Sequence, residues 1–356
     1  MKHRSLYSEL TDYWSSPAVS PQLPVWRQLL EMAAIYLGRR IGPRYYLQAR
    51  WGRQSIPFKD KWQHINSAEY RQLASRLNSV GYQKASQHKL IEKSVLSLLR
   101  LPTPKFIAWV HPLRGRCAAG NPVRRPEQLS ELLKQHIHKR VCFKLVEGFG
   151  GFGFASYQII PAGNTIALLR KEGESAISAE DWWHTNALNP DGFIIESYLE
   201  QHSEMAALND SSVNTIRIWV ILDGSRWKTL GALLRIGRQG SQVDNTSSGG
   251  IVCPIDIQTG TIREAFDPMQ PARSLQKHPD SQAPLVGIQI PFWHEAIELG
   301  EQAIAAFPLI RLAGLDIAIT QLGPSVIELN VLPDRIGCAA MDLPLKTRIV
   351  GVAREN

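Results

Sequence analysis

Hydrophobic positions along the chain follow two periods, and the period changes repeatedly from one segment to the next. Spacing of three and four residues, which marks one face of a helix, runs through residues 24–37, 67–80, 86–99, 126–138 and 292–307. Alternating or short apolar runs, which are typical of strands, occupy residues 105–110, 154–160, 192–200, 214–222, 228–236, 251–257, 312–319 and 325–330. This order predicts an α+β (mixed α/β) chain whose helices, including the one at 24–37, pack their apolar faces against a core.

The most unusual stretch runs from Val141 to Ile160, where Lys144 in an apolar strand precedes four glycines within six residues. Glycine lets backbone N–H groups close on a ligand such as phosphate. The segment after the glycines is β-prone, so the loop is predicted to join antiparallel strands, whereas a dinucleotide fingerprint joins a strand to a helix. A kinase loop carries its lysine on a later strand. A glycine hairpin without a ligand stays open as an alternative. The glycines are Gly148, Gly150, Gly151 and Gly153.

The last two predicted strands form a hairpin around the turn at residues 323–324. Asp316 lies on one strand, while Glu328 and Asn330 lie two residues apart on the other and therefore on one face. Carboxylate and amide oxygens are ligands that Mg²⁺ prefers, and such an ion usually bridges to substrate phosphates. A metal would explain how buried acids are tolerated, and a plain exposed face is the alternative.

Two arginines, Arg217 and Arg235, each interrupt an apolar strand. A buried arginine needs an anionic partner, whereas one that faces solvent from a two-sided sheet needs none. A polar loop at 244–250 follows the second of these strands, and loops of this kind often carry function. The strand at 192–200 is either an ordinary edge strand or one that offers backbone groups to an adenine ring.

Composition narrows the partners only a little. The 356 residues are enough for two or three domains, and 44% apolar with 20% charged residues is the composition of an ordinary globular protein. A net charge of +8 favours anionic partners, which include nucleotides, acidic polymers, nucleic acid and membrane surfaces. Basic residues interleave with aromatic ones between residues 39 and 61, where a solvated surface is the better interpretation than a nucleic-acid site. No nucleic-acid partner is therefore expected.

The four cysteines are scattered without metal or disulfide spacing, which favours reduced thiols in the cytosol. The polar N-terminus lacks the apolar run of a signal peptide. No window approaches the roughly 18 apolar residues of a membrane span. A cytoplasmic protein without a transmembrane segment is expected, and peripheral attachment to a membrane through basic, tryptophan-bearing helices stays open.

From about Lys89 to Gly337, the order of these motifs resembles the ATP-grasp superfamily. The segments SSVNTIRI and DNTSSGG are most similar to the ATP-grasp group associated with sugar-transfer gene clusters, within the α-L-glutamate-ligase-like branch. The resemblance implies two α+β lobes that enclose ATP, preceded by a helical N-terminal region. It divides the chain into that region at 1–85, a linking α/β part at 86–125, a small lobe at 126–200 and a large lobe at 201–356.

The resemblance also implies roles for the candidate residues. ATP would be bound by Lys89, Lys144, Gly148, Gly150, Gly151, Gly153, Glu196, Tyr198, Leu199 and Glu204. One or two Mg²⁺ ions would be held by Asp316, Glu328 and Asn330. Arg217 and Arg235 would be catalytic, and the substrate would contact Asn214, Asn245, Ser248 and Gly249. His88 precedes Lys89 at a place where an aspartate is usual in the family.

The activity that the resemblance implies is ATP-dependent ligation. A carboxylate would attack the γ-phosphate of ATP to give an acyl phosphate and ADP, and an amine or another nucleophile would then displace phosphate. The carboxylate would belong to an amino acid, a peptide or an acidic saccharide. The alternatives are an ATP-dependent kinase or phosphotransferase of the same fold and a non-catalytic ATP-binding module in polysaccharide synthesis.

Overall fold

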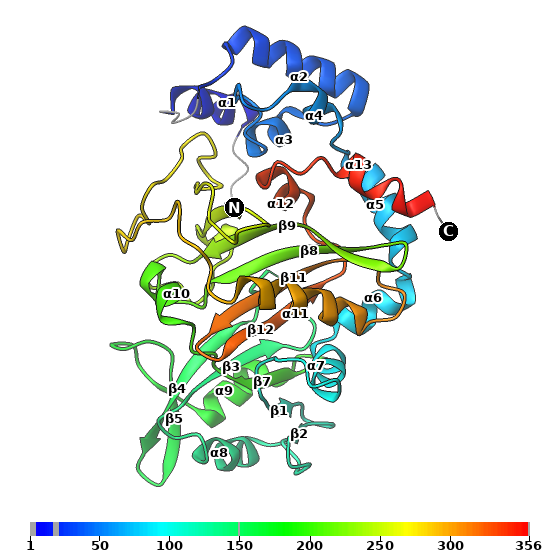
Figure 1. The fold of residues 1–356 in the computed structure, drawn as a ribbon. Helices are drawn as coiled ribbons and strands as arrows, with labels where there is room; N and C mark the ends of the chain where they lie inside the picture. The colour runs from blue at the N-terminus through cyan, green and yellow to red at the C-terminus, as the bar shows by residue number, and fades with distance from the viewer. Residues whose placement is uncertain (1–4, 17–20, 149, 355–356) are drawn as a thin grey trace. The chain divides into compact units, whose positions relative to one another are not determined.

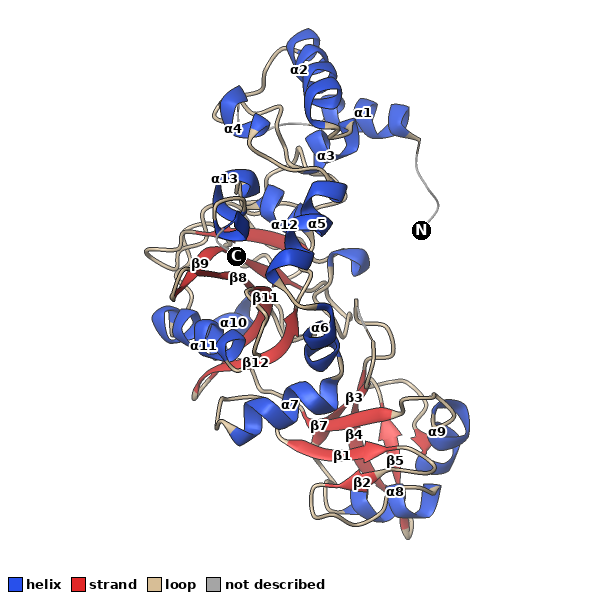
Figure 2. Ribbon diagram, turned by 90° about the vertical axis from the view of Figure 1, so that its right-hand side faces the viewer, coloured by secondary structure: helices blue, strands red, loops and turns tan. Residues whose placement is uncertain are grey.

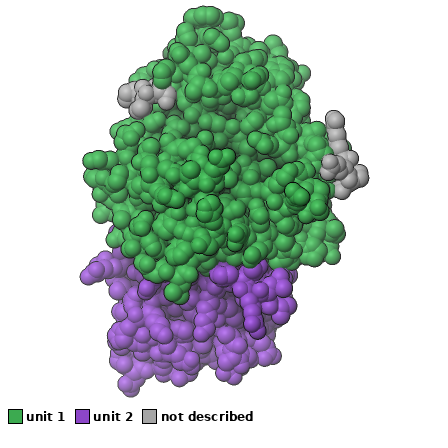
Figure 3. All heavy atoms as spheres, viewed as in Figure 1, with its two compact units in different colours: residues 1–84, 201–356 green, residues 85–200 purple. Residues whose placement is uncertain are grey.

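The computed structural model describes residues 5–16, 21–148 and 150–354. Two compact units make up the chain, which Figure 3 shows in different colours. Unit 1 consists of Met1–Lys84 and Gln201–Asn356, and unit 2 consists of Ala85–Glu200. The helical region expected at 1–85 therefore groups with residues 201–356, and the parts expected at 86–125 and 126–200 together form unit 2.

Unit 2 is built on a seven-stranded antiparallel sheet with the strand order β2-β1-β7-β3-β4-β5-β6 (Figure 1). Its elements are α7 (Lys89–Leu98), β1 (Phe106–Val110), β2 (Arg116–Cys117), α8 (Pro126–Lys134), β3 (Arg140–Leu145), β4 (Ala155–Ala162), β5 (Thr165–Leu169), β6 (Ile177–Ser178), α9 (Ala179–Asn186) and β7 (Phe193–Ser197).

The two faces of this sheet differ because side chains alternate along each strand. Phe143 of β3 belongs to the core formed with α8 and α9, and its ring centroid lies 4.5 Å from that of Trp182. Cys142 and Lys144 alternate with Phe143 and thus belong to the other face. Glu196 of β7 pairs with Cys142 across the strands and shares that face. The predicted lysine is therefore presented away from the α8 and α9 core.

Unit 1 contains a five-stranded antiparallel sheet with the strand order β10-β9-β8-β11-β12 (Figure 2). The elements before unit 2 are α1 (Leu6–Ser15), α2 (Val25–Arg39), α3 (Pro43–Gln48), α4 (Phe58–Trp62), α5 (Ser67–Leu77) and α6 (Val80–Gln87), the last of which crosses the boundary between the units. The elements after unit 2 are α10 (Ser203–Leu208), β8 (Thr215–Asp223), β9 (Arg226–Ile236), η1 (Thr246–Ser248), β10 (Ile251–Ile255), α11 (Trp293–Ala305), β11 (Leu312–Thr320), β12 (Gly323–Asn330), α12 (Arg335–Ala340), α13 (Leu345–Ile349) and η2 (Val352–Arg354).

Helices cover both faces of the unit 1 sheet. Helix α11 packs on one face, where Gly300 lies next to the side chain of Ile317 of β11. The opposite face carries Trp219, which is fully buried beside Tyr70 of α5 and Cys338 of α12. Arg217 lies two residues before Trp219 on β8 and therefore shares the face of the tryptophan.

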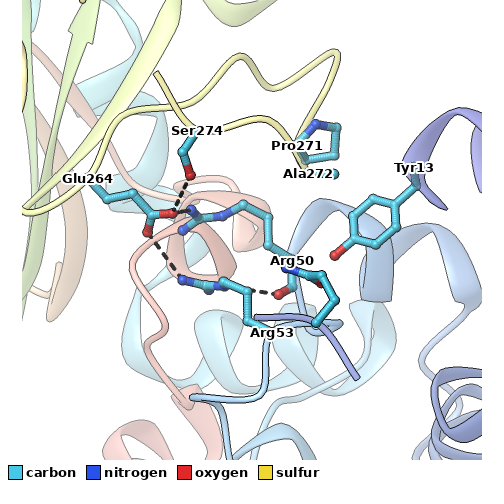
Figure 4. A pocket seen from close by; sticks show the side chains of 8 residues that line it. Tyr13, Arg50, Arg53, Glu264, Pro271, Ala272 and Ser274 are labelled. Carbon is cyan, nitrogen blue, oxygen red and sulfur yellow. Dashed lines mark hydrogen bonds and ion pairs between the residues drawn. The ribbon is translucent and has the colours of Figure 1, made fainter. Parts of the chain in front are cut away.

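Ion pairs tie helices α1 to α4 to the rest of unit 1 (Figure 4). Arg50 and Arg53, which follow α3, both reach the carboxylate of Glu264, at 2.5 Å and 3.2 Å. Arg53 also pairs with Asp342 at 2.5 Å, and Ser274 donates a hydrogen bond to Glu264 at 3.3 Å. The arginines are 2% and 7% exposed, so these contacts are largely shielded from water.

The predicted strands and the long helices are confirmed, including the antiparallel hairpin at the end of the chain. One packing prediction is wrong. The apolar face by which the helix at 24–37 was expected to pack is mostly exposed, because α2 turns the polar residues Gln28 and Glu31 inward together with Met32 and Ile35. Among the described residues, no helix is long and apolar enough to cross a membrane.

Candidate active site

The glycine-rich stretch connects β3 to β4, which are antiparallel neighbours as the sequence predicts. Gly150, Gly151 and Gly153 have φ angles of 63°, 77° and 70°, a region that favours glycine. A Cβ at Gly148 would lie 3.1 Å from the carbonyl oxygen of Phe152, whereas one at Gly150 would meet nothing within 4 Å. The hairpin thus needs glycine for its backbone path at three positions and for space at a fourth.

Two predicted lysines lie at the start of this hairpin. Lys144 Nζ is 2.7 Å from Glu196 Oε2, and Lys89 Nζ donates a hydrogen bond to the carbonyl oxygen of Gly148 at 2.8 Å. Burial raises the pKa of Glu196, but the ammonium groups of Lys144 and Lys93 outweigh it and hold this pKa below its ordinary value. Within unit 2, the structure therefore brings Lys89, Lys144, Gly148 and Glu196 together.

The residues expected at the adenine follow directly after β7. Tyr198 is half-buried, and its backbone N–H donates to the carbonyl oxygen of Arg140 at 3.3 Å. The guanidinium of Arg140 lies 5.5 Å from the centroid of the Tyr198 ring, and Leu199 is half-buried next to it in the chain. Glu204, expected at the ribose, is an exposed residue in the first turn of α10 and belongs to unit 1.

In unit 1, Asp316 of β11 lies across the sheet from Arg217 of β8. Its carboxylate accepts hydrogen bonds from Nε of Arg217 and, at 2.9 Å, from a terminal guanidinium nitrogen of the same residue. A guanidinium nitrogen of Arg235 also lies 2.9 Å from Asp316. Burial opposes ionisation of Asp316, but the two arginines outweigh it and hold the pKa below its ordinary value. Both predicted arginines are thus mostly buried and share one anion.

A second carboxylate, Asp244, lies behind Arg235. It is 3.6 Å from Nε of Arg235 and accepts hydrogen bonds from the backbone N–H and the hydroxyl of Thr215, at 2.9 Å and 2.5 Å. Burial lowers the pKa of Arg235, but the carboxylates of Asp244 and Asp316 raise it above its ordinary value overall. The guanidinium is therefore fixed in charge and in position.

Glu328 of β12 lies directly opposite Asp316 of β11, and Asn330 lies opposite Gly314. Both side chains are half-buried. In the part of the chain that the structure describes, Asn330 Nδ2 has no hydrogen-bond partner. The side chains that the sequence singled out as metal ligands therefore lie on adjacent strands at the same level of the sheet.

These three residues fit a magnesium ion by their chemistry. They offer two carboxylates and an amide oxygen, the donors that this ion takes. No three His, Cys, Asp or Glu side chains among the described residues converge into a complete ligand set. Asp316 is also held by Arg217 and Arg235, so a metal ion would share that carboxylate with the arginines.

The residues expected at the substrate divide into two kinds. Asn214 is fully buried, and its amide donates to the carbonyl oxygens of Met205 and Asn209 at 2.8 Å and 2.9 Å. These hydrogen bonds give Asn214 a structural role, because they connect α10 to the start of β8. Asn245, Ser248 and Gly249 lie in the loop around η1, which is half-buried to exposed.

Comparison with known proteins now adds the family. No match is found among curated proteins. The sequence model of the sugar-transfer associated ATP-grasp family matches residues 69–352, which is most of the chain. The chain belongs to this family. Helices α1 to α4 precede the matched region, whereas the glycine hairpin, both arginine strands and the Asp316 hairpin of this ATP-grasp protein lie inside it.

Many solved structures share the ATP-grasp fold at low sequence identity. N5-carboxyaminoimidazole synthetase from Staphylococcus aureus, complexed with ADP, is 12% identical over 82% of this chain and 58% of that chain, with a TM-score of 0.45. Biotin carboxylase from Campylobacter jejuni is 14% identical over 84% and 53%, with a TM-score of 0.46. The ATP-grasp ligase PsnB, complexed with a precursor variant, Mg and ADP, is 16% identical over 78% and 62%, with a TM-score of 0.41. This ATP-grasp chain thus spans between half and two thirds of the length of these structures, and such distant likenesses carry no argument about its substrate.

Sequence reasoning missed several side chains that contact the predicted ones. Lys93 and Glu92 of α7 are buried, and Lys93 Nζ lies 4.0 Å from Glu196 and 3.7 Å from Glu92. Lys89 and Lys93 lie four residues apart on an amphipathic helix, and this spacing was a signal that Lys93 and its neighbour Glu92 lie near the predicted site. Asp244 was visible only as the first residue of a polar loop. We call Lys89, Lys93, Lys144, Glu92 and Glu196 the lysine cluster, and Arg217, Arg235, Asp244, Asp316 and Glu328 the arginine cluster.

Proposed function

We propose that this protein is an ATP-dependent, ADP-forming ligase that joins a carboxylate to an amine or another nucleophile through an acyl phosphate. The observation that carries the proposal is the arrangement in unit 1, where Arg217 and Arg235 share the carboxylate of Asp316 directly opposite Glu328. Positioned cations are the main source of catalysis in phosphoryl transfer. Membership of the ATP-grasp family supports ATP as the phosphoryl donor.

In this proposal, unit 2 supplies all of the ATP-binding groups except Glu204, which belongs to unit 1. Lys144 and Lys89 bind phosphate oxygens, and the glycine hairpin brings backbone N–H groups to the same phosphates. Glu196 holds the ammonium group of Lys144 in place through their 2.7 Å contact. Tyr198 and Leu199 contact the adenine with backbone and apolar groups, and Glu204 binds the ribose.

Asp316, Glu328 and Asn330 hold one or two Mg²⁺ ions in this proposal. These side chains would hold the ion, which would supply positive charge to offset the negative charge of the phosphates. Sharing Asp316 with two arginines keeps that carboxylate ionised, since its pKa lies below the ordinary value. The side chain is therefore ready to accept a cation throughout the neutral pH range.

The reaction proceeds in two displacements. A substrate carboxylate oxygen forms a bond to the γ-phosphorus, the bond from that phosphorus to the bridging oxygen breaks, and ADP leaves. An amine then attacks the carbonyl carbon of the acyl phosphate, and phosphate leaves with the carbon–oxygen bonding electrons while the amine loses a proton. Arg217 and Arg235 bind the acyl phosphate and the tetrahedral oxyanion, because a guanidinium matches such oxygens in pairs.

An acidic saccharide, such as one that bears a uronate, is the substrate class that we favour for the carboxylate. The family description refers to sugar transfer, and the chain carries a net charge of +8. Asn245, Ser248 and Gly249, in the polar loop that precedes β10, would contact this substrate. An amino acid or a short peptide is the alternative to the saccharide as the carboxylate substrate, or else it is the amine substrate.

The test uses the full chain with Mg·ATP and pools of uronates, amino acids and amines, with ADP and phosphate measured after each incubation. A carboxylate labelled with oxygen-18 should transfer the label to the released phosphate, because only acyl-phosphate chemistry moves that oxygen. Release of ADP without label transfer would assign the protein as a kinase that phosphorylates a hydroxyl. If calorimetry detects binding of Mg·ATP but no pool yields ADP, the protein is a non-catalytic ATP-binding module rather than a ligase.

A further inference from the structure

Helix α2 buries the polar side chains of Gln28 and Glu31 beside Met32 and Ile35, and it leaves most of its apolar side chains exposed. Gln28 and Glu31 are 2% and 7% exposed, whereas Trp26, Leu30 and Leu37 are 65%, 63% and 71% exposed. Residues three and four apart lie on one face of a helix, so the exposed apolar side chains form a continuous row. We call Trp26, Leu29, Leu30, Ala33 and Leu37 the α2 stripe.

Buried polar contacts fix the helix in this orientation. Lys61 Nζ of α4 lies 2.6 Å from the carboxylate of Glu31, and the hydroxyl of Tyr46 donates to the same carboxylate at 3.0 Å. Gln28 donates to the carbonyl oxygen of Leu23 at 2.7 Å. Rolling the α2 stripe inward would leave Glu31 and Lys61 without each other in the interior, where an unpaired charge is very unfavourable. The stripe is therefore held on the surface.

Figures 1 and 2 show the same arrangement from two directions. Helices α1, α3 and α4 all lie on one side of α2, and no described element of unit 1 covers its other side. Exposed apolar rows of this kind mark interaction surfaces, because isolated apolar residues are ordinary but contiguous ones are not.

The exposed charges on and beside α2 are mainly positive, although Arg27 also lies 3.6 Å from Glu31. Arg27, whose side chain is 55% exposed, and the exposed cap residue Arg40 belong to α2 itself. The structure describes α2 throughout, and its one acidic residue, Glu31, is turned inward against Lys61. Helix α4 packs on α2 and adds exposed Phe58 and Lys59, together with the half-buried Asp60.

We propose that the α2 stripe lies in the surface of a lipid bilayer that carries anionic headgroups. The tryptophan and leucines enter the boundary between headgroups and acyl chains, while Arg27, Arg40 and Lys59 meet the negative charge. A second copy of the chain fits the surface less well. A helix of 15 residues is about 22 Å long, and the outer face of one such helix falls well short of the roughly 800 Å² per partner of a stable interface. Symmetric self-pairing would also bring the arginines together.

Vesicle flotation tests the proposal with the full chain. Vesicles of phosphatidylcholine with about 30% phosphatidylglycerol should carry the protein, and vesicles of phosphatidylcholine alone should carry much less of it. Combining Trp26→Ser, Leu30→Ser and Leu37→Ser should lower the partition coefficient by on the order of 1000-fold, because each lost apolar side chain removes roughly tenfold. The matched control combines Leu98→Ser and Leu322→Ser, which are 82% and 99% exposed elsewhere and should leave binding unchanged.

Charge and fold are checked separately. Arg27→Gln with Arg40→Gln should weaken binding to anionic vesicles and leave the small binding to neutral ones as it is. All substituted side chains are exposed, so circular dichroism and Tm should match those of the unchanged chain. Failure of the unchanged chain to float, or equal flotation of the stripe variant, would overturn the proposal. Sedimentation equilibrium that shows a dimer broken by the stripe substitutions, without vesicle binding, would assign the face to a second copy instead.

Discussion

The lysine cluster and the arginine cluster both place cations against buried carboxylates, but in opposite proportion. In unit 2, three lysines accompany the two carboxyl groups of Glu92 and Glu196. In unit 1, two arginines accompany the three carboxyl groups of Asp244, Asp316 and Glu328. An excess of positive charge attracts phosphate and an excess of negative charge attracts a metal ion. The lysine cluster is therefore suited to an anion, and the arginine cluster to a cation.

The choice of cation differs for a physical reason as well. A lysine ammonium is a compact charge on a flexible stem, so Lys144 can exchange Glu196 for a phosphate oxygen with little rearrangement. An arginine presents several donors in a rigid plane, and Arg217 uses two of them on Asp316. The lysine cluster can thus exchange partners, whereas the arginine cluster is preorganised.

The largest effect should follow from removing the shared anion of the arginine cluster. Asp316→Ala leaves Arg217 and Arg235 buried with less compensation, and breaking such a buried pair typically costs about 3–5 kcal/mol of unfolding free energy. Urea unfolding measures this loss, and ligase turnover should disappear with it. The matched control is Asp223→Ala, whose partner Lys228 is 55% exposed, and it should cost under about 1 kcal/mol. Equal losses for the two variants would remove the distinction between a preorganised and a solvated pair.

Glu328→Gln should separate activity from stability. The glutamine keeps the shape of the side chain but loses the charge that a cation needs, so kcat should fall on the order of 100-fold or more with Tm in the absence of metal unchanged. Added Mg²⁺ with ATP should raise the Tm of the unchanged chain and not that of the variant, which gives a readout apart from turnover. Glu298→Gln, an exposed position on α11, serves as the control. A variant with full activity would place the metal elsewhere.

Lys144→Met should change how stability depends on pH. The pKa of Glu196 lies below its ordinary value of 4.5, so this residue contributes stability above pH 4.5 that is lost as the pH falls from there through its folded pKa. Without Lys144 that pKa rises toward or above 4.5, so the loss of stability on acidification becomes smaller, and the cost at neutral pH is about 1–3 kcal/mol. Tm measured against pH tests this, and Lys134→Met, beside the exposed Glu131, should leave the profile unchanged.

The smallest effects concern the backbone of the glycine hairpin. Gly150→Ala places a Cβ at positive φ in open space, so the expected cost is roughly 1–2 kcal/mol from backbone strain alone. Gly153→Ala should cost more, because its Cβ would come within 2.4 Å of Leu145 in addition to the same strain. Urea unfolding of the two variants gives the difference between their losses of unfolding free energy. That difference should vanish when both glycine substitutions are compared in a chain that carries Leu145→Ala. An unchanged difference in that pair would mean that strain, rather than the leucine, decides it.

Period and motif order were enough to predict most of the fold. The β-prone residues on both sides of the glycines gave β3, its hairpin and β4, and the apolar runs on both sides of the turn at residues 323–324 gave β11 and β12. The short strands β5 and β6 and helices α12 and α13 were not predicted. Segments this short gain their stability from tertiary packing rather than from local pattern.

The sequence could not reveal which groups pair. Arg235 and Asp244 are nine residues apart and Arg217 and Asp316 ninety-nine, and only the sheet brings each pair together. Helix α2 shows the same limit from the opposite side. Its apolar period was read as a packing face, but a buried Glu31 and Lys61 pair decides which face turns inward. Periodicity identifies a helix with two faces, and long-range partners choose between them.

Arg50 and Arg53 have a consequence for any attempt to isolate the family region. Trimming the chain to residues 69–352 would remove both arginines and leave Glu264 and Asp342 without these ion pairs. It would also expose the apolar surface around Ala272 and Ala339, which packs against the first helices in the full chain. The shortened protein would expose apolar surface that the full chain buries, and it should therefore aggregate. A protein expressed to study the family region should therefore include helices α1 to α4, which cover this apolar surface.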